Sequence, residues 1–389
     1  MRRSEQTRVI RGLMQHLDDG TNVDAGCQVR NPVSSYTSGD LAAREWEGFF
    51  QDYPQVLGLS ADLPDPESFF TSNDLGKPIL CTRAEDGVFR AFLNVCRHRA
   101  TIVEEEPRGH KKRFQCPFHA WTYDARGALV GVPKEGHFGK IDRECHSLVA
   151  LPAVERHGLL WVSPSPEGTI DVDSLLGDLG PELASWQLER CQRHNDVRYD
   201  HSMNWKLAID TFGETYHFNT LHRNSLAENF YGNVQTYDRY ARNHRMMLCM
   251  KSIDALRGKP EDEWNVLHAA LPVYYLFPNI QLIVGQGGPT LVRVYPEGPN
   301  PHQSFTQTGF YLYPEVLESE FAEMVGMRLE GFGRVIRDED YVAAASGHRG
   351  ARSGAVEYVT FGRNEPALHH YHNTYRDALG LPPLETVGE

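Results

Sequence analysis

Residues 96–119 read CRHRATIVEEEPRGHKKRFQCPFH, and this stretch contains the strongest local signal in the chain. It holds two arms, Cys96 with His98 and Cys116 with His119, separated by 17 intervening residues. One thiolate and one imidazole per arm can hold a tetrahedral zinc ion, or a [2Fe–2S] cluster with two cysteines on one iron and two histidines on the other. Zinc fingers usually group cysteine with cysteine and histidine with histidine, so the mixed arms favour the cluster.

Further along the chain, residues 204–222 read NWKLAIDTFGETYHFNTLH and include His217 and His222. Two imidazoles and one carboxylate form a facial triad, which holds Fe(II) and leaves positions open for O₂ and substrate. Apolar residues near a 3.6-residue period predict a helix here, which must end or bend near Asn219 for both imidazoles to converge. Because the chain has 18 histidines, the pair alone is a weak signal.

Both stretches, in this order, resemble the Rieske non-haem iron oxygenases, the aromatic ring-hydroxylating dioxygenase alpha-subunit family. The resemblance rests on CRHRA, CPFHAWTYD and GALVGVP around the first motif, on NWKLAIDTFGETYHFNTLH, and more broadly on residues 275–284 and 335–345. It implies a [2Fe–2S] cluster on the four residues of the two arms. Ala100 and Ala120 stand where the family very often has Gly, and we expect only a small backbone or packing change there.

The resemblance also implies the ligands of a separate iron. His217 and His222 would be two of them, and family members commonly supply an Asp at the second position of a late acidic pair. In VIRDEDYVAAA, residues 335–345, that match points to Asp340. Asp338 and Glu339 are expected to belong to a solvated acidic face.

Glu214 lies three residues before His217 and matches a family position that bridges two metal centres. There an acidic residue connects the iron-ligand histidine to a cluster-ligand histidine of the neighbouring subunit, so Glu214 would orient the imidazole and couple the electron path. Asp210, two turns before His217 in the predicted helix, is a weaker candidate for a supporting role.

Together the two centres imply an oxygenase that inserts oxygen into a small organic substrate. Electrons would come from NAD(P)H only indirectly, through a separate reductase or ferredoxin, because the chain has no Gly-rich dinucleotide fingerprint. Phe212, Tyr274, Tyr275 and Phe277 suggest an aromatic-lined pocket for an aromatic or alicyclic compound, although each is more simply a core residue. The alternatives are a quaternary ammonium substrate, an electron-transfer protein without catalysis, and a zinc-stabilised binding module.

The predicted fold class is α+β. Short runs rich in Val, Phe, Leu and Tyr, separated by Gly, Asp and Pro turns, predict a small antiparallel β domain, here a Rieske domain at residues 65–165. By resemblance, residues 166–389 form a helix-grip catalytic domain, a curved antiparallel sheet with helices, and residues 1–64 form a helical segment that packs on it. A head-to-tail homotrimer is expected, since the two metals of one subunit are generally too far apart for fast transfer.

Composition narrows the partners. A net charge of −13 disfavours nucleic acid. Seven cysteines, two of them in the cluster motif, do not suggest a disulfide scaffold. The charged N-terminus is no signal peptide, and the most apolar stretch is too short and too polar for a membrane span. These features favour a cytoplasmic protein.

Overall fold

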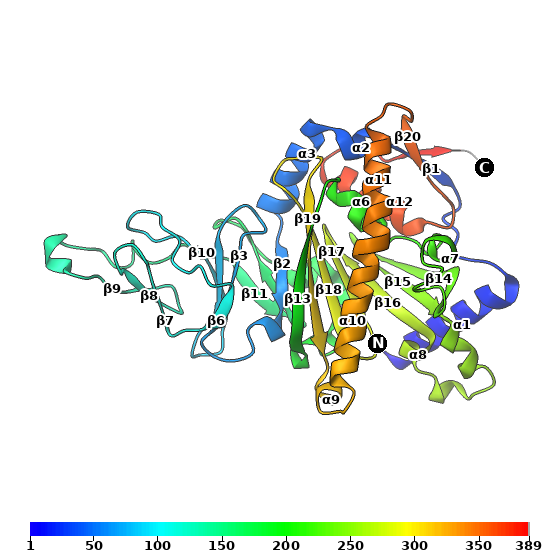
Figure 1. The fold of residues 1–389 in the computed structure, drawn as a ribbon, viewed down its shortest axis with the longest axis horizontal. Coiled ribbons are helices and arrows are strands. Elements are labelled where there is room, and N and C mark those ends of the chain that lie inside the picture. The colour runs from blue at the N-terminus through cyan, green and yellow to red at the C-terminus, as the bar shows by residue number, and fades with distance from the viewer. Residues whose placement is uncertain (388–389) are drawn as a thin grey trace. The chain divides into compact units, whose positions relative to one another are not determined.

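The computed structural model describes residues 1–387, and the chain forms two compact units (Figure 1). The small unit comprises residues 47–172 and 187–192, and the large unit comprises residues 1–46, 173–186 and 193–389. Both units contain antiparallel sheets, and the large unit also contains long helices. The predicted α+β class is therefore confirmed.

Short strands form three antiparallel sheets in the small unit, as the run of short apolar segments predicted. The largest contains β10 (Ala150–Leu151), β5 (Phe89–Leu93), β4 (Ile79–Arg83), β3 (Ser68–Ser72) and β6 (Arg108–His110), in spatial order. The others are β11 (Ala153–Arg156), β12 (Leu159–Val162) and β2 (Gln55–Leu59), and β7 (Arg113–Gln115), β8 (Thr122–Asp124) and β9 (Leu129–Gly131). Cys96 and Cys116 belong to the buried core of this unit, next to Trp121 and Tyr123.

A seven-stranded antiparallel sheet organises the large unit. Its spatial order is β13 (Gln192–His201), β19 (Ser304–Leu312), β18 (Pro289–Pro296), β17 (Ile280–Val284), β16 (Ala270–Leu276), β15 (Asn243–Met250) and β14 (Phe230–Tyr240). Strands β16 to β19, which follow one another in the chain, are thus neighbours in this sheet. A separate three-stranded sheet contains β20 (Tyr358–Phe361), β1 (Gln28–Pro32) and β21 (Glu385–Val387).

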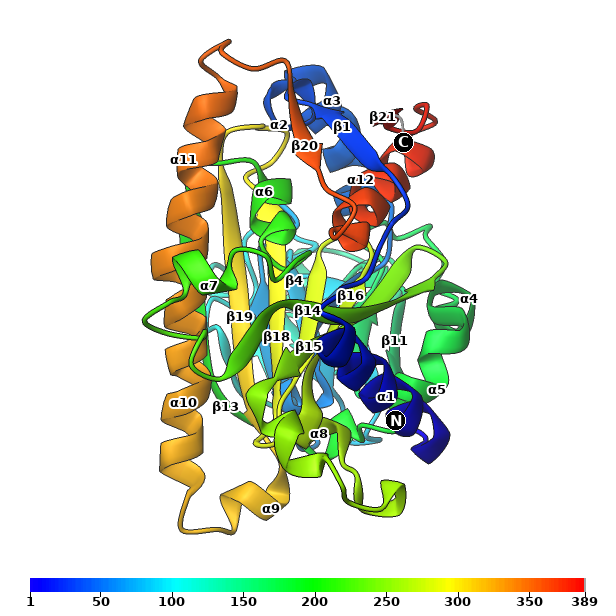
Figure 2. The same ribbon diagram turned by 90° about the vertical axis from the view of Figure 1, so that its right-hand side faces the viewer.

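A long helical run lies along this sheet beside β19 (Figure 2). It consists of α10 (Ala322–Val335), the π-helical turn η8 (Ile336–Asp340) and α11 (Tyr341–Ala351). Gly333 permits the close approach of helix and sheet, because a Cβ there would lie 2.6 Å from Cζ of Phe310. The π turn matters because such interruptions of α-helices frequently occur at functional sites.

The other α-helices are shorter, apart from the two at the chain ends. They are α1 (Arg3–Asp19), α2 (Ser34–Thr37), α3 (Gly39–Glu45), α4 (Val172–Leu176), α5 (Gly180–Ala184), α6 (Trp205–Asp210), α7 (Phe218–Leu221), α8 (Val266–Ala269), α9 (Pro314–Leu317) and α12 (Pro366–Ala378). Among residues 1–387, no helix combines the length and the apolar character that crossing a bilayer requires.

The prediction of a helix that begins near residue 204 and ends or bends only near Asn219 is wrong, because the helix stops much earlier. Helix α6 starts at its cap Asn204 and stops at Asp210, and α7 begins only after a turn. Gly213 lies in this break, where a Cβ would be 2.6 Å from Leu368 and 2.8 Å from Tyr371 of α12. The backbone passes so close to α12 that a side chain there would clash, a tertiary contact that periodicity does not report.

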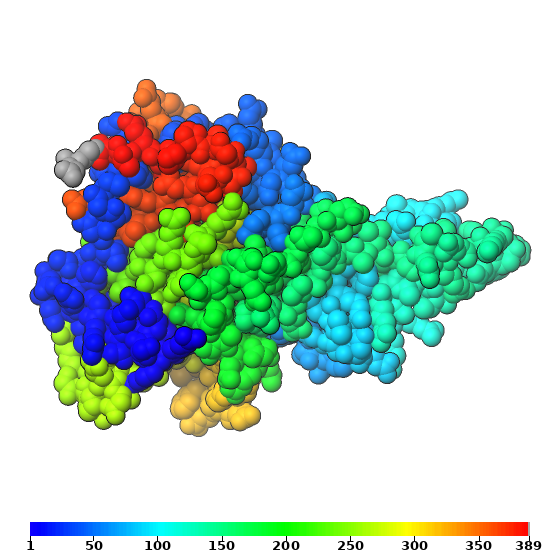
Figure 3. All heavy atoms as spheres, turned by 180° about the vertical axis from the view of Figure 1, so that it is seen from behind, coloured from blue at the N-terminus to red at the C-terminus, as the bar shows by residue number. Residues whose placement is uncertain are grey.

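Helix α1 packs on the large unit through the buried stripe Val9, Ile10 and Leu13. Figure 3 shows this helix, in blue, beside the yellow-green segment that precedes β16. Fully buried Arg245 of β15 stabilises this packing through an ion pair to Glu5 of α1. It also forms ion pairs to Glu182 at 2.6 Å and to Asp238 at 2.6 Å. The N-terminal helix is therefore part of the large unit's core.

A buried ion pair joins α3 to α6. Nζ of Lys206 lies 2.6 Å from both carboxylate oxygens of Glu45, and the indole N–H of Trp205 donates to the same carboxylate at 3.1 Å. Both charged side chains are only 2% exposed. Burial lowers the pKa of Lys206, and the carboxylate of Glu45 opposes that shift by stabilising the charged ammonium.

Lys206→Met should destabilise the large unit by roughly 3–5 kcal/mol, because Glu45 would keep a buried charge without a partner. The double variant Glu45→Gln/Lys206→Met should lose less, since no charge then remains buried and the amide can still accept from Trp205. Urea unfolding measures both values. As control, Arg11→Met removes an exposed ion pair to Glu261 and should leave stability nearly unchanged. Equal losses for Lys206→Met and Arg11→Met would contradict the argument.

Candidate functional site

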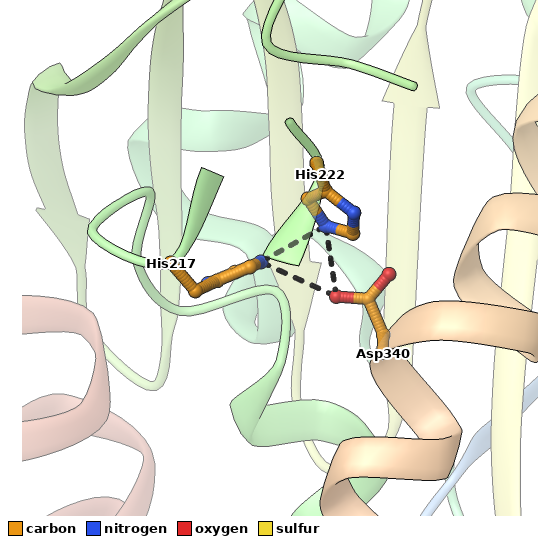
Figure 4. Close-up of side chains that lie close together, drawn as sticks. All are labelled: His217, His222 and Asp340. Carbon is orange, nitrogen blue, oxygen red and sulfur yellow. Dashed lines mark hydrogen bonds and ion pairs between the residues drawn. The ribbon is translucent and has the colours of Figure 1, made fainter. Parts of the chain in front are cut away.

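Three side chains from two segments of the large unit, distant from each other in sequence, converge on one point. His217 and His222 flank the short helix α7, as its N-cap and C-cap residues, and Asp340 is the last residue of the π turn η8. Figure 4 shows the two imidazoles and the carboxylate pointing toward one another. His222 and Asp340 are buried, and His217 is partly buried.

The three facing atoms form an even triangle. Nε2 of His217 lies 3.2 Å from Nε2 of His222, and each of these nitrogens lies 3.2 Å from Oδ1 of Asp340. Ligands in adjacent positions, each about 2.1 Å from a divalent metal, are about 3.0 Å apart. The spacing therefore fits one face of a metal's coordination shell.

The charges around the three converging side chains favour a positive charge between them. Burial alone would lower the pKa of His217, but hydrogen bonds with Asp340 and Glu214 outweigh it and raise the pKa to about 9. Burial likewise opposes ionisation of Asp340, yet hydrogen bonds with both histidines hold its pKa below the usual value. A divalent cation would supply the charge that these groups otherwise take from protons.

Each imidazole also contacts a second carboxylate through its other nitrogen. Nδ1 of His217 lies in hydrogen-bond contact with Glu214, whose carboxylate also accepts from the backbone N–H of Tyr216. Nδ1 of His222 lies 2.8 Å from Oε2 of Glu339. The expectation that Glu339 belongs to a solvated face is thus wrong, because the π turn carries it inward beside Asp340.

Two other predicted acidic positions lie outside the triad. Asp338 is exposed and pairs with Arg337 at 2.6 Å, as expected of a solvated face. Asp210 turns to a buried network instead, with Nε2 of His372 at 2.9 Å and the hydroxyl of Tyr36 donating at 2.7 Å. Its contacts connect α6 with α12 and with the N-terminal region, not with the three converging atoms.

An apolar pocket adjoins the triad. Its lining includes the iron-site candidates and the side chains of Phe212, Phe218, Leu226, Leu248, Val273, Ile283, Phe332 and Ile336. No lysine or arginine is among the described residues that line it. Of the aromatic residues named from sequence, Phe212 lines the pocket, whereas Tyr274 and Tyr275 are fully buried and donate to Glu182 and to a backbone carbonyl.

In the small unit, the two cysteine–histidine arms form two loops of matching hydrogen bonding. The backbone N–H of Cys96 donates to the carbonyl of Thr101 at 2.8 Å, and that of Ala100 donates back to Cys96 at 2.9 Å. The second loop repeats the pattern between Cys116 and Trp121 at 2.8 Å and between Ala120 and Cys116 at 3.0 Å. Both loops therefore hold a buried cysteine in the same backbone setting.

The donor atoms of these loops suit a two-iron cluster better than a single zinc ion. The rings of His98 and His119 lie 4.7 Å apart between centroids, and His98 stacks on Trp121. The buried Nδ1 of His98 has no hydrogen-bond partner among residues 1–387, as expected of a metal-binding nitrogen. Within residues 1–387, the His, Cys, Asp and Glu side chains whose ligand atoms lie within 4.8 Å of one another, in a group of three or more, are His217, His222 and Asp340. The four cysteine and histidine residues of the loops form no such group, whereas tetrahedral zinc would require all four ligand atoms around one centre.

Two family models match the chain. Residues 54–150 match the Rieske [2Fe-2S] domain, and residues 188–381 match the catalytic domain of the ring hydroxylating alpha subunit. The first range contains both cysteine–histidine loops, and the second contains His217, His222 and Asp340.

Two bacterial proteins are among those similar to this chain. The chain is 28% identical over 197 residues to the carnitine monooxygenase oxygenase subunit of Acinetobacter pittii, covering 49% of this chain and 52% of that protein. It is 28% identical over 388 residues to the putrescine 2-hydroxylase of Ralstonia nicotianae, covering 94% of this chain and 100% of that protein. The matched part thus spans about half the length of the carnitine enzyme and all of the putrescine enzyme.

Solved structures share the fold. The quaternary ammonium Rieske monooxygenase CntA, in complex with L-carnitine, superposes with a TM-score of 0.76 at 20% identity, covering 91% of this chain and 96% of that one. Naphthalene 1,2-dioxygenase from a Rhodococcus species, bound to indole, gives a TM-score of 0.70 at 18% identity, covering 96% and 98%.

Ala100→Gly and Ala120→Gly should each stabilise the small unit by about 0.5–1 kcal/mol. Both alanines adopt the left-handed conformation, with φ of 58°, which costs a residue with a Cβ roughly 1–2 kcal/mol, only part of which the extra freedom of unfolded glycine offsets. Thermal unfolding followed at the cluster absorption measures the effect. Gly136→Ala, at an exposed site with open space around it, serves as a control without left-handed strain. Destabilisation by both glycines would contradict the strain argument.

Proposed function

We propose, since this chain belongs to the Rieske non-haem iron oxygenases, that it is the oxygenase component that uses O₂ and reductase-supplied electrons to hydroxylate or oxidatively demethylate a small organic molecule. The observation that carries the proposal is the triangle of His217, His222 and Asp340 beside an apolar pocket. A protein that only transferred electrons would not need three converging ligands next to a space for substrate.

We assign the two metal centres to specific residues. Cys96, His98, Cys116 and His119 would hold the [2Fe–2S] cluster, and His217, His222 and Asp340 would hold the Fe(II). When bound, the cluster supplies one-electron storage and the iron supplies O₂ activation. The chain's own residues set the ligand directions: α7 presents one imidazole from each end, and η8 turns the carboxylate toward both.

Glu214 would have a second role besides orienting His217. Its contact with Nδ1 fixes which ring nitrogen faces the metal. Its side chain remains partly exposed, 14%, next to the exposed ring of Tyr216. We propose that Glu214 connects the iron-ligand histidine to a cluster-ligand histidine of a neighbouring copy, in a homotrimer.

The pocket supports an uncharged aromatic or alicyclic substrate. Eight apolar side chains line it, three of them phenylalanines, and they would be desolvated by an apolar ligand. A carboxylate-bearing substrate would need a cationic partner, and none of the described lining residues provides one.

A quaternary ammonium substrate is the second candidate. Phe212, Phe218 and Phe332 line the pocket and can offer ring faces to a trimethylammonium group. Several similar proteins carry such substrates in their names, among them the choline monooxygenase of Spinacia oleracea, 25% identical over 357 residues.

The wider setting is also proposed. The division into residues 1–64, 65–165 and 166–389 remains a prediction, as do the homotrimer, the separate reductase or ferredoxin, and the cytoplasmic location. The seven cysteines are free thiols or potential metal ligands, which is consistent with a reducing compartment.

The purified protein should be brown, with about three irons and two acid-labile sulfides per chain. Given a surrogate reductase and O₂, it should oxidise an uncharged ring compound from a panel that also contains carnitine, glycine betaine and choline, read by product mass. His222→Ala should keep the colour and sulfide but lose one iron and all turnover, because one triad ligand is missing. Two irons in the unaltered protein would instead indicate electron transfer without catalysis, and zinc without sulfide would indicate a structural module.

Glu214→Ala, when supplied with excess Fe(II), should hold both metals yet slow electron delivery to the iron by at least 10-fold, because the connection between the centres is lost. Single-turnover oxidation of the pre-reduced cluster with substrate and O₂ measures this rate. Glu365→Gln changes a partly buried carboxylate that accepts a hydrogen bond from the backbone N–H of Gly362, and it serves as control, expected to match the unaltered protein. A Glu214→Ala rate within twofold of that control would count against the bridging role.

A further inference from the structure

The ring of His222 lies between two carboxylates that come from consecutive residues. Oδ1 of Asp340 is 3.2 Å from Nε2, and Oε2 of Glu339 is 2.8 Å from Nδ1. Consecutive residues of an α-helix point about 100° apart, which seldom brings both to one ring. Here the π turn η8 contains both residues, and its wider winding lets them contact opposite nitrogens of the same imidazole.

Glu339 is itself held in place. The hydroxyl of Ser225, three residues after His222, donates to the same Oε2 at 2.9 Å. Ser225 is fixed in turn, because its backbone N–H donates to the carbonyl of His222 at 3.0 Å. The side chain of Glu339 is 29% exposed, and its neighbouring cation, Arg337, is paired with Asp338. Its ordered partners are therefore the imidazole and the hydroxyl.

We propose that Glu339 is a positioning residue for the mononuclear iron, acting through His222. The inference rests on the proposed function, since it assumes that Nε2 of His222 binds the metal. By accepting the proton on Nδ1, Glu339 holds the imidazole in the tautomer whose free electron pair is on Nε2, facing Asp340. A carboxylate in this position also makes the imidazole a stronger ligand.

Glu339 and Glu214 therefore orient different histidines in the same way, each through Nδ1 of the imidazole. Only Glu214 also belongs to the proposed electron path. Glu214 is the carboxylate of His217 and stands beside exposed Tyr216, whereas Glu339 faces Ser225 within the same unit. Loss of Glu339 should weaken iron binding without slowing electron transfer in molecules that still hold iron. This separation distinguishes the two carboxylates experimentally.

The test is the Fe(II) affinity of cluster-containing protein stripped of its mononuclear iron, measured anaerobically by competition with a chromogenic chelator. Glu339→Ala should weaken binding by about 10–100-fold, the usual loss for a residue that orients a metal-bound histidine. Glu339→Gln should recover much of that loss, because its amide oxygen can still accept from Nδ1. Ser225→Ala should give a smaller loss, and Asp338→Ala, the adjacent exposed acid, should stay within twofold.

Cobalt(II) gives a readout that a mere loss of stability would not move. The visible spectrum of Co(II) in the triad should shift in Glu339→Ala and return toward the original in Glu339→Gln, while the cluster absorption and the unfolding temperature stay the same. If Glu339→Ala binds Fe(II) as tightly as Asp338→Ala, or if Glu339→Gln is as weak as Glu339→Ala, the inference is wrong. If the unaltered protein binds no mononuclear iron, it is the proposed function that fails.

Discussion

Nε2 of His217, Nε2 of His222 and Oδ1 of Asp340 meet 3.2 Å apart although Asp340 lies more than a hundred positions after the two histidines in the chain, and the large unit is arranged around that convergence. Helix α6 contacts β18 and helix α10 contacts β19, so two neighbouring strands of the sheet position both segments. Gly333 brings α10 close to β19, and the π turn then aims Asp340 at the two imidazoles. Gly213 performs the matching task on the other side by letting the chain turn against α12 before α7 begins.

The same convergence creates an electrostatic demand. Carboxylates that are partly or fully buried repel one another and lose hydration, so they persist only when paired with positive charge. Glu214, Glu339 and Asp340 surround two imidazoles, which would otherwise have to stay protonated, as the raised pKa of His217 shows. A divalent cation resolves this more completely than protons do. Elsewhere in the unit the buried charges of Arg245 and Lys206 are matched by carboxylates of the protein itself.

The small unit meets a different constraint, since its two loops must present cysteine and histidine from the same backbone geometry. The left-handed residues at Ala100 and Ala120 are the points where each loop closes. Alanine at these two positions, where the family usually has glycine, therefore keeps the loop shape at the cost of some backbone strain. These two loops contain the buried Cys96 and Cys116 and the Nδ1 of His98, which has no hydrogen-bond partner among residues 1–387.

Local sequence determined what depends on short spacing. The cysteine–histidine arms and the short strands around them could be read directly from the sequence, because turn residues and alternating patterns act over a few positions. The histidine pair and Asp340 could be named only because a resemblance ranked them above the other histidines and acids. Tertiary structure alone decided the break at Gly213, the π turn and the inward direction of Glu339. These depend on contacts with α12, β19 and His222, which are remote in sequence, and helical periodicity carries no record of a neighbour that approaches from elsewhere in the chain.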